Sequence, residues 1–262
     1  MLQEDNQLVK WLEDHSLRAI IFDFDGVLLD VKEPLESAVR EVFEKNDIEV
    51  DLDKSIQEIG SVLESVQGYA MPKIILQSHD IFEYITTLED ISFMKKLKLA
   101  TEIFTKYLEY EKDAELFPAA YLLLKQLSKR YDLYIVSHNQ TKNLKSHLEE
   151  KNIGQFFKGF YGADQLPELK PSRKALKPVF DNYESPDLDE FLMIGDMPTD
   201  IEAGQEAGIW TVGISSGISN KELLASYRPN LLIESLTEML ELFRIEFSKT
   251  SIKKAKKSIK IY

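Results

Sequence analysis

Two carboxylates, Asp23 and Asp25, stand two residues apart at the end of an apolar run and precede Gly26. The run from Arg18 to Phe22 is typical of a buried parallel strand, because such strands are almost continuously apolar. Ligands of open α/β sheets gather beyond the carboxyl ends of the strands. One carboxylate placed there can attack an electrophile while its neighbour moves a proton. The alternative interpretation is an ordinary polar loop after a strand. The residues at the other strand ends distinguish a polar loop from a catalytic site.

The segment Ser137-His138-Asn139 follows an expected strand at 133–136. A hydroxyl and unbonded backbone N–H groups at a strand-to-helix turn suit the oxygens of a phosphate group. Simple capping of the following helix is the alternative.

Lys170 stands before Pro171, which predicts an extended or turn conformation for the lysine just before a helix. A fixed ammonium group at this position can neutralise a phosphoryl group and restrain a nucleophilic carboxylate. An ordinary surface lysine is the alternative. Lys177, which is also followed by proline, is the rival for this role. Its gap to Asp196 leaves little room for the intervening helix and strand of a βαβ step, so Lys170 is favoured.

Asp196 and Asp200 follow an expected strand at 191–194. Carboxylates are the ligands that a hard cation such as Mg²⁺ requires, and one or two usually suffice because water completes the coordination. Capping of the next helix is the alternative for Asp200, whereas an acid directly beside a buried strand favours a cation partner for Asp196.

These four segments need a framework that brings strand ends together. Strands that alternate with helices predict a doubly wound α/β fold with a parallel sheet covered on both faces. We expect strands at 18–22, 133–136, 160–161, 191–194, 210–214 and 231–233, and helices at 7–17, 119–129, 141–151, 172–182, 200–207 and 236–247. From 34 to 115 the apolar residues repeat only at helical spacing. The expected domains are therefore an α/β core at 1–33 and 116–248, a helical insertion at 34–115 and a lysine-rich tail at 249–262.

The composition narrows the class of protein. The 262 residues carry a net charge of −13, which argues against a nucleic-acid partner, because phosphate backbones require a basic surface. No apolar stretch approaches the roughly 20 residues that span a bilayer, so no membrane partner is expected. The chain has no cysteine and its first residues are polar and acidic, which favours a cytoplasmic location. The sequence leaves the oligomeric state undetermined.

Taken in this order, the four motifs resemble those of haloacid dehalogenase superfamily hydrolases. They are most similar to the phosphoglycolate-phosphatase-like branch, whose members carry a helical cap after the first motif. The resemblance runs from about Arg18 to Leu240. It implies a Rossmann-like core with a helical cap at 34–115, and a Mg²⁺-dependent phosphatase that acts on a small phosphorylated metabolite.

The resemblance also implies catalytic roles. Asp23 would be the nucleophile that forms an aspartyl-phosphate, and Asp25 the acid and base that protonates the leaving group and later activates water. Lys170 would pair with Asp23 and with the phosphate.

Binding roles follow in the same way. Ser137, with His138 and Asn139 that follow it, would hold the phosphoryl group together with Lys170. The residues implied in metal binding are Asp23, Asp25 (through its backbone carbonyl), Asp196 and Asp200.

Two alternative functions stay open. A phosphomutase shares this core, although the cap lacks the His/Arg-Gly pattern of sugar-phosphate mutases. A non-catalytic member would bind a ligand or partner through its cap or lysine-rich tail. Asp25 favours phosphoryl chemistry over dehalogenation, since the dehalogenases of the superfamily lack this second acid. Substrate choice would lie in the cap, where the polar candidates near Gly60-Ser61 are Tyr69, Lys73 and His79, for each of which a solvated helix surface is the alternative.

Overall fold

The computed structural model describes residues 6–14, 17–52, 54–56, 58–59 and 86–245. The chain forms two compact units. The core unit consists of Met1–Leu29 and Leu116–Tyr262, and the inserted unit consists of Asp30–Glu115. The tail at 249–262 and the candidates Gly60-Ser61, Tyr69, Lys73 and His79 lie outside the described residues.

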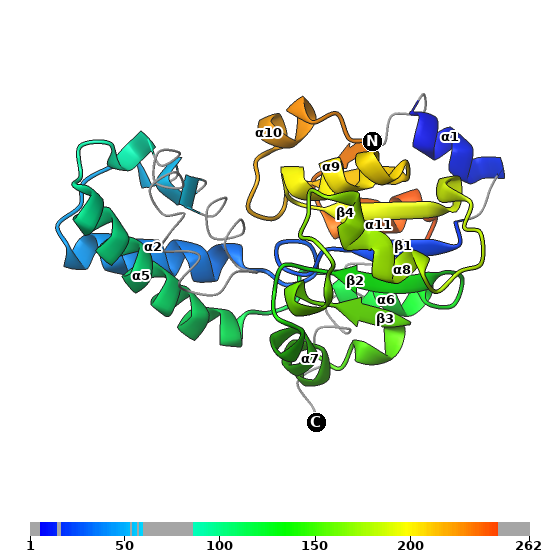
Figure 1. The fold of residues 1–262 in the computed structure, drawn as a ribbon, viewed down its shortest axis with the longest axis horizontal. Helices are drawn as coiled ribbons and strands as arrows, with labels where there is room; N and C mark the ends of the chain where they lie inside the picture. The colour runs from blue at the N-terminus through cyan, green and yellow to red at the C-terminus, as the bar shows by residue number, and fades with distance from the viewer. Residues whose placement is uncertain (1–5, 15–16, 53, 57, 60–85, 246–262) are drawn as a thin grey trace. The chain divides into compact units, whose positions relative to one another are not determined.

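The core unit is built on a parallel sheet of six strands in the order β3-β2-β1-β4-β5-β6 (Figure 1). Along the chain, β1, β2 and β3 follow one another toward one edge of the sheet, and β4, β5 and β6 follow one another toward the other edge, as in doubly wound folds. The α/β class expected from the sequence is therefore confirmed. The strands are β1 (Ala19–Phe22), β2 (Asp132–Val136), β3 (Gly159–Tyr161), β4 (Phe191–Gly195), β5 (Trp210–Ile214) and β6 (Leu231–Ile233).

Helices cover the sheet because its strands are apolar on both faces. Alternate side chains of β1, β2 and β4, among them Ile21 and Met193, form one core cluster with Ala175, Leu176 and Val179. Those last three belong to η5 (Arg173–Leu176) and α8 (Lys177–Phe180), while α9 (Pro198–Ala207) packs against β4 and β5. The remaining helices of this unit are α1 (Gln7–Asp14), α6 (Ala120–Leu127), α7 (Thr141–Glu150), α10 (Lys221–Ser226) and α11 (Leu236–Leu242).

Three helical segments differ from the sequence expectation. The expected helix 172–182 is a 3-10 turn followed by the short α8, because Pro178 has no N–H to continue the hydrogen-bond ladder. The helix expected at 236–247 ends at Leu242. Helix α10 was not expected. Its one local signal is the N-cap Asn220, whose side chain accepts a hydrogen bond from the Leu223 N–H at 2.8 Å.

The inserted unit is helical and contains no strand in its described residues, 30–52, 54–56, 58–59 and 86–115. Helix α2 (Lys32–Lys45) packs against α5 (Phe93–Tyr110) through apolar faces at helical spacing. Polar contacts join the same two helices, since the side chains of Lys106 and Tyr110 both bind Glu41. Among the described helices of both units, none is long and apolar enough to cross a membrane.

Candidate active site

The motif residues lie together because three neighbouring strands end at one edge of the sheet. In the register of the sheet, Phe22 of β1 is level with Ile135 of β2 and Ile194 of β4. Asp23 therefore follows the central strand directly, and its N–H donates to the Ile194 carbonyl at 2.9 Å. Ser137 and Asp196 begin the segments that leave β2 and β4. This edge lies where the strand order reverses, which is the usual ligand position in open α/β sheets.

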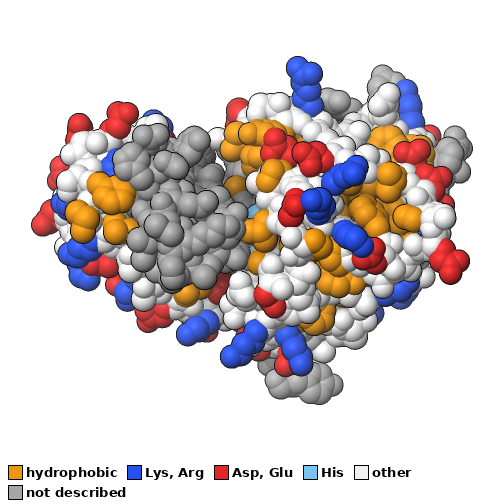
Figure 2. All heavy atoms as spheres, viewed as in Figure 1, with side chains coloured by type: hydrophobic (Ala, Val, Ile, Leu, Met, Phe, Trp, Pro, Cys, Tyr) orange, Lys and Arg blue, Asp and Glu red, His pale blue; other side chains and the backbone are white. Residues whose placement is uncertain are grey.

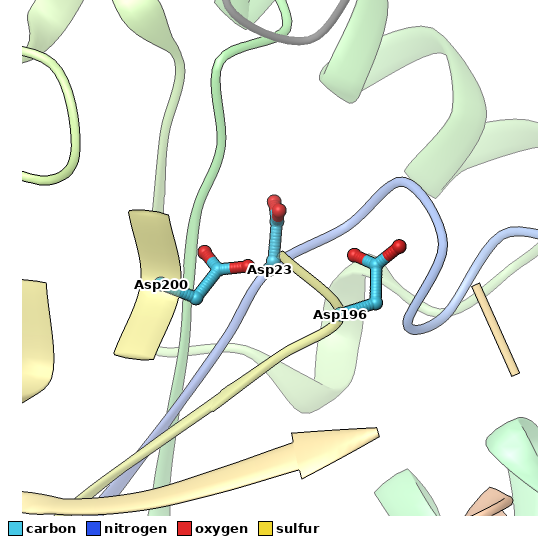
Figure 3. Close-up of side chains that lie close together, drawn as sticks. All are labelled: Asp23, Asp196 and Asp200. Carbon is cyan, nitrogen blue, oxygen red and sulfur yellow. The ribbon is translucent and has the colours of Figure 1, made fainter. Parts of the chain in front are cut away.

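Three buried carboxylates lie close together at this edge (Figure 3). Oxygen atoms of Asp23, Asp196 and Asp200 all lie within 4.8 Å of one another. Asp23 follows β1, Asp196 follows β4, and Asp200 lies in the first turn of α9. Burial, reinforced by the negative charges of Asp23 and Asp200, raises the pKa of Asp196 well above its ordinary value. Burial is also the main reason that the pKa of Asp200 is raised to about 7, against the lowering effect of a nearby lysine.

That lysine is Lys170, whose side chain is fully buried. Its Nζ lies 3.0 Å from Asp23 Oδ2 and 2.5 Å from Asp200 Oδ1, so one ammonium group is shared by two carboxylates. The rival Lys177 is exposed and pairs with Asp181 at 2.6 Å. In the space-filling view of Figure 2, basic side chains lie among acidic ones. Of the two lysines that precede a proline in this region, the structure brings Lys170 to the carboxylates.

The Asp23 carboxylate is held at both oxygens. Its Oδ1 accepts a hydrogen bond from the Phe24 N–H at 2.6 Å, while its Oδ2 binds Lys170. Donors on both sides restrict rotation of the carboxylate plane. A carboxylate prepared in this way is suited to attack an electrophile without first reorganising.

Asp25 and the segment after β2 are joined by a buried hydrogen bond. Asn139 Nδ2 donates to Asp25 Oδ2 at 3.1 Å, and the Asn139 N–H donates to Ser137 Oγ at 3.1 Å. Ser137, His138 and Asn139 are all at most 3% exposed. Ser137 does not cap α7. The first N–H of that helix, on Thr141, instead donates to Asp164 Oδ1 at 2.7 Å.

Asp200 combines the two roles that the sequence left open. Its Oδ2 accepts from the Met197 N–H at 3.0 Å and so caps the start of α9, while its Oδ1 binds Lys170. Gly195 makes this close approach possible, because a Cβ at that position would lie 2.1 Å from the Asp200 Cβ.

A loop that sequence reasoning missed holds Asp196. The Ile218 N–H, in the loop after β5, donates to Asp196 Oδ2 at 2.8 Å. A Cβ on Gly217 would lie 2.0 Å from the same oxygen, and one on Gly26 would lie 2.1 Å from it. The available signal was Ser215-Ser216-Gly217 directly after the strand 210–214, again at a carboxyl strand end.

This geometry suits a hard divalent cation. Asp196 Oδ1 is buried and has no hydrogen-bond partner among the described residues. Adjacent carboxylates from three elements are costly without positive charge, and Lys170 binds only two of them. An all-oxygen donor set of this kind matches the preference of Mg²⁺.

Comparison with known proteins agrees with this geometry. The family model for haloacid dehalogenase-like hydrolases matches residues 20–214, more than half of the chain. The chain belongs to the haloacid dehalogenase-like hydrolase family. The matched region contains every motif residue of the carboxylate edge, from Asp23 through Asp200.

Individual relatives of this hydrolase are distant but cover nearly all of it. It is 25% identical over 241 residues to a phosphoglycolate phosphatase from Vibrio parahaemolyticus, covering 89% of this chain and 99% of the relative. A haloacid dehalogenase-like family hydrolase from Streptococcus pneumoniae has a similar fold, with a TM-score of 0.60, 24% identity, and coverage of 87% of this chain and 98% of that one. The Bacillus subtilis protein YfnB, solved with bound magnesium, gives a TM-score of 0.63 at 21% identity, with 88% and 100% covered.

Proposed function

We propose that this hydrolase is a Mg²⁺-dependent phosphatase that cleaves a small phosphate monoester through an aspartyl-phosphate at Asp23. The observation that carries the proposal is the shared Lys170 beside Asp23, with Asp196 and Asp200 completing a buried carboxylate cluster. Phosphoryl transfer depends mainly on positioning and on neutralising charge, and this cluster offers both. The relative from Vibrio parahaemolyticus makes phosphoglycolate the first ester to test.

In the first step, an Asp23 oxygen attacks phosphorus and the bond from phosphorus to the ester oxygen breaks. Asp25 gives its proton to that oxygen, which leaves as an alcohol. In the second step, Asp25 takes a proton from water as the water oxygen attacks phosphorus, and the bond from phosphorus to Asp23 breaks. Inorganic phosphate leaves, and both carboxyl groups return to their starting protonation states.

The other residues bind and orient the phosphoryl group. Because Ser137 Oγ already accepts from the Asn139 N–H, its hydroxyl proton is available to a phosphoryl oxygen. Lys170 restrains Asp23 and contributes positive charge, and His138 completes the segment that we assign to phosphate binding. Asp23, Asp196 and Asp200, with the backbone carbonyl of Asp25, would hold Mg²⁺, which when bound supplies positive charge that offsets the phosphoryl oxygens.

The test is release of inorganic phosphate from phosphoglycolate, other phosphorylated metabolites and a generic aryl phosphate, with Mg²⁺ and with a chelator. We expect metal-dependent release that Asp23→Asn abolishes, because the amide is not a nucleophile. The variant should remain folded, as circular dichroism and thermal unfolding can verify.

Near-wild-type turnover by Asp23→Asn would contradict the proposed nucleophile. Transfer of phosphate to another hydroxyl, without release, would identify a mutase. A folded, metal-binding protein that acts on none of the esters would favour a non-catalytic role.

A further inference from the structure

Asn139 occupies an unusual position for a residue expected to bind phosphate, because its side chain is already engaged. Its Nδ2 donates to Asp25 Oδ2 at 3.1 Å, and its Oδ1 accepts from the Gln140 N–H at 2.8 Å and from Asn143 Nδ2 at 3.1 Å. Asn139 is only 3% exposed and Asp25 only 8%. The contact joins residues 114 positions apart, across the ends of β1 and β2.

The backbone decides which way the Asn139 amide faces. The Gln140 N–H is a donor only, so the group opposite it must be the carbonyl oxygen of the Asn139 side chain. The amino group then faces Asp25. The backbone of Asn139 is also fixed, since its N–H donates to Ser137 Oγ at 3.1 Å and its carbonyl accepts from the Ala163 N–H at 2.9 Å. A buried amide held at these points has little freedom to rotate away.

This orientation has a consequence for Asp25. A donor directed at Asp25 Oδ2 makes that oxygen an acceptor, so the oxygen that gives a proton to a leaving group is Oδ1. The same hydrogen bond fixes the plane of the carboxyl group relative to Asp23, two residues earlier. General acid catalysis depends on such alignment, because the proton must lie within hydrogen-bond reach of the departing oxygen.

We propose that Asn139 is a positioning residue, which orients Asp25 so that Oδ1 faces the leaving group. The inference rests on the proposed function and deepens it. It also separates Asn139 from Ser137 within the same motif, since Ser137 would contact the phosphoryl group while Asn139 would act through Asp25. The signature of this role is dependence on the leaving group. Expulsion of an alkoxide needs the proton from Asp25, whereas a nitrophenolate departs with little assistance.

The experiment compares kcat/KM for phosphoglycolate, an alkyl ester, with kcat/KM for 4-nitrophenyl phosphate at saturating Mg²⁺. Only steps up to formation of the aspartyl-phosphate enter kcat/KM, so the later water attack does not affect the comparison. Asn139→Asp keeps the shape and the acceptor opposite Gln140 but replaces the amino donor with a carboxylate oxygen facing Asp25. Asn139→Ala removes the contact entirely. Asn182→Ala is the matched control, because Asn182 is an exposed amide that contacts Tyr161 and the backbone of α8 instead of the motif residues.

For both Asn139 variants we expect kcat/KM for phosphoglycolate to fall by roughly 10- to 100-fold, a fraction of the 10²- to 10⁴-fold that a general acid provides. For 4-nitrophenyl phosphate the fall should be no more than about 3-fold, since this leaving group needs little protonation. Asn182→Ala should leave both values unchanged, and inhibition by inorganic phosphate should be similar in all four proteins.

Equal losses for the two esters would overturn the proposal, as would weaker inhibition by inorganic phosphate in the Asn139 variants, which would place Asn139 in phosphate binding. Should Asn139→Ala fail to fold, the comparison rests on the isosteric Asn139→Asp alone. A wild-type protein that releases phosphate from no ester of the panel described above would refute the proposed function itself, which is a distinct result from equal losses in an active protein.

Discussion

Substitution of Gly217 by alanine tests the proposed Mg²⁺ site through a group that would not itself be a ligand. The added Cβ would lie 2.0 Å from Asp196 Oδ2 and 2.5 Å from Asp196 Cγ, whereas ordinary contact begins at 3.4 Å. Either the carboxylate or the loop must therefore move by about 1.4 Å. Gly217 does not adopt the left-handed backbone conformation, so the substitution acts through space alone.

The size of the effect follows from what this movement breaks. Asp196 Oδ2 accepts the Ile218 N–H at 2.8 Å. In the metal-bound state, where the carboxylate is ionised, a hydrogen bond to such a charged group contributes roughly 1.5–3 kcal/mol. Mg²⁺ also requires ligand distances near 2.0–2.1 Å, which a displaced carboxylate no longer satisfies. Because about 1.4 kcal/mol corresponds to a tenfold change in an equilibrium constant, we expect Mg²⁺ to bind roughly 10- to 100-fold more weakly.

Isothermal titration calorimetry with Mg²⁺ measures this change without any substrate. Gly154→Ala is the matched control, because its Cβ would lie 3.6 Å from the nearest atom, Leu148 Cβ, at ordinary contact distance. A folded Gly217→Ala protein whose Mg²⁺ affinity lies within twofold of the wild type would refute the reasoning. An equal loss of affinity in Gly154→Ala would refute it as well.

Two further substitutions test the charge balance of the core unit. Lys170→Met leaves the buried carboxylates of Asp23 and Asp200 without the ammonium group that they share, so the free energy of unfolding should fall by about 3–5 kcal/mol, measured with urea in a chelator at pH 7. Lys177→Met removes an exposed ion pair and should change the free energy of unfolding by less than about 1 kcal/mol. Similar losses in the two variants would contradict this prediction. For Asp132, burial raises the pKa, but hydrogen bonds from Lys158 and Tyr183 outweigh it and lower the pKa below its ordinary 3.8. The folded state therefore favours the ionised group, and its stabilisation is present above pH 3.8 and is lost as the pH falls through the lowered pKa. Asp132→Asn should lower the thermal unfolding midpoint at pH 7, and the difference in midpoint between this variant and the wild type should shrink below pH 3.8. A difference in midpoint that stays constant down to pH 2 would count against a stabilising role for the ionised Asp132.

The framework of the core unit was predictable because it depends on local patterns. Short apolar runs that alternate with helical segments predicted a parallel sheet, and all six expected strands are present within a residue or so of their expected ends. Helix boundaries were less accurate. Pro178 divides the expected helix 172–182, and α10 has only six residues, too few for a periodic apolar pattern.

The sequence by itself predicted that Asp23, Ser137 and Asp196 would gather at one edge, because each follows a strand and the carboxyl ends of parallel strands share that edge. Lys170 was expected there as well, because it lies between a strand and the helix that follows it. Only the tertiary structure decided how they are connected. Lys170 bridges Asp23 and Asp200, the amide of Asn139 faces Asp25, and the loop at Gly217 encloses Asp196. The ion pairs of Lys170 and the hydrogen bonds Asn139–Asp25 and Ile218–Asp196 join residues 22 to 147 positions apart, and the approach of Gly217 to Asp196 leaves no room for a Cβ. The spacing of residues along the sequence does not predict these contacts. They depend on strand register and on the path of the loops, which the packed core as a whole determines.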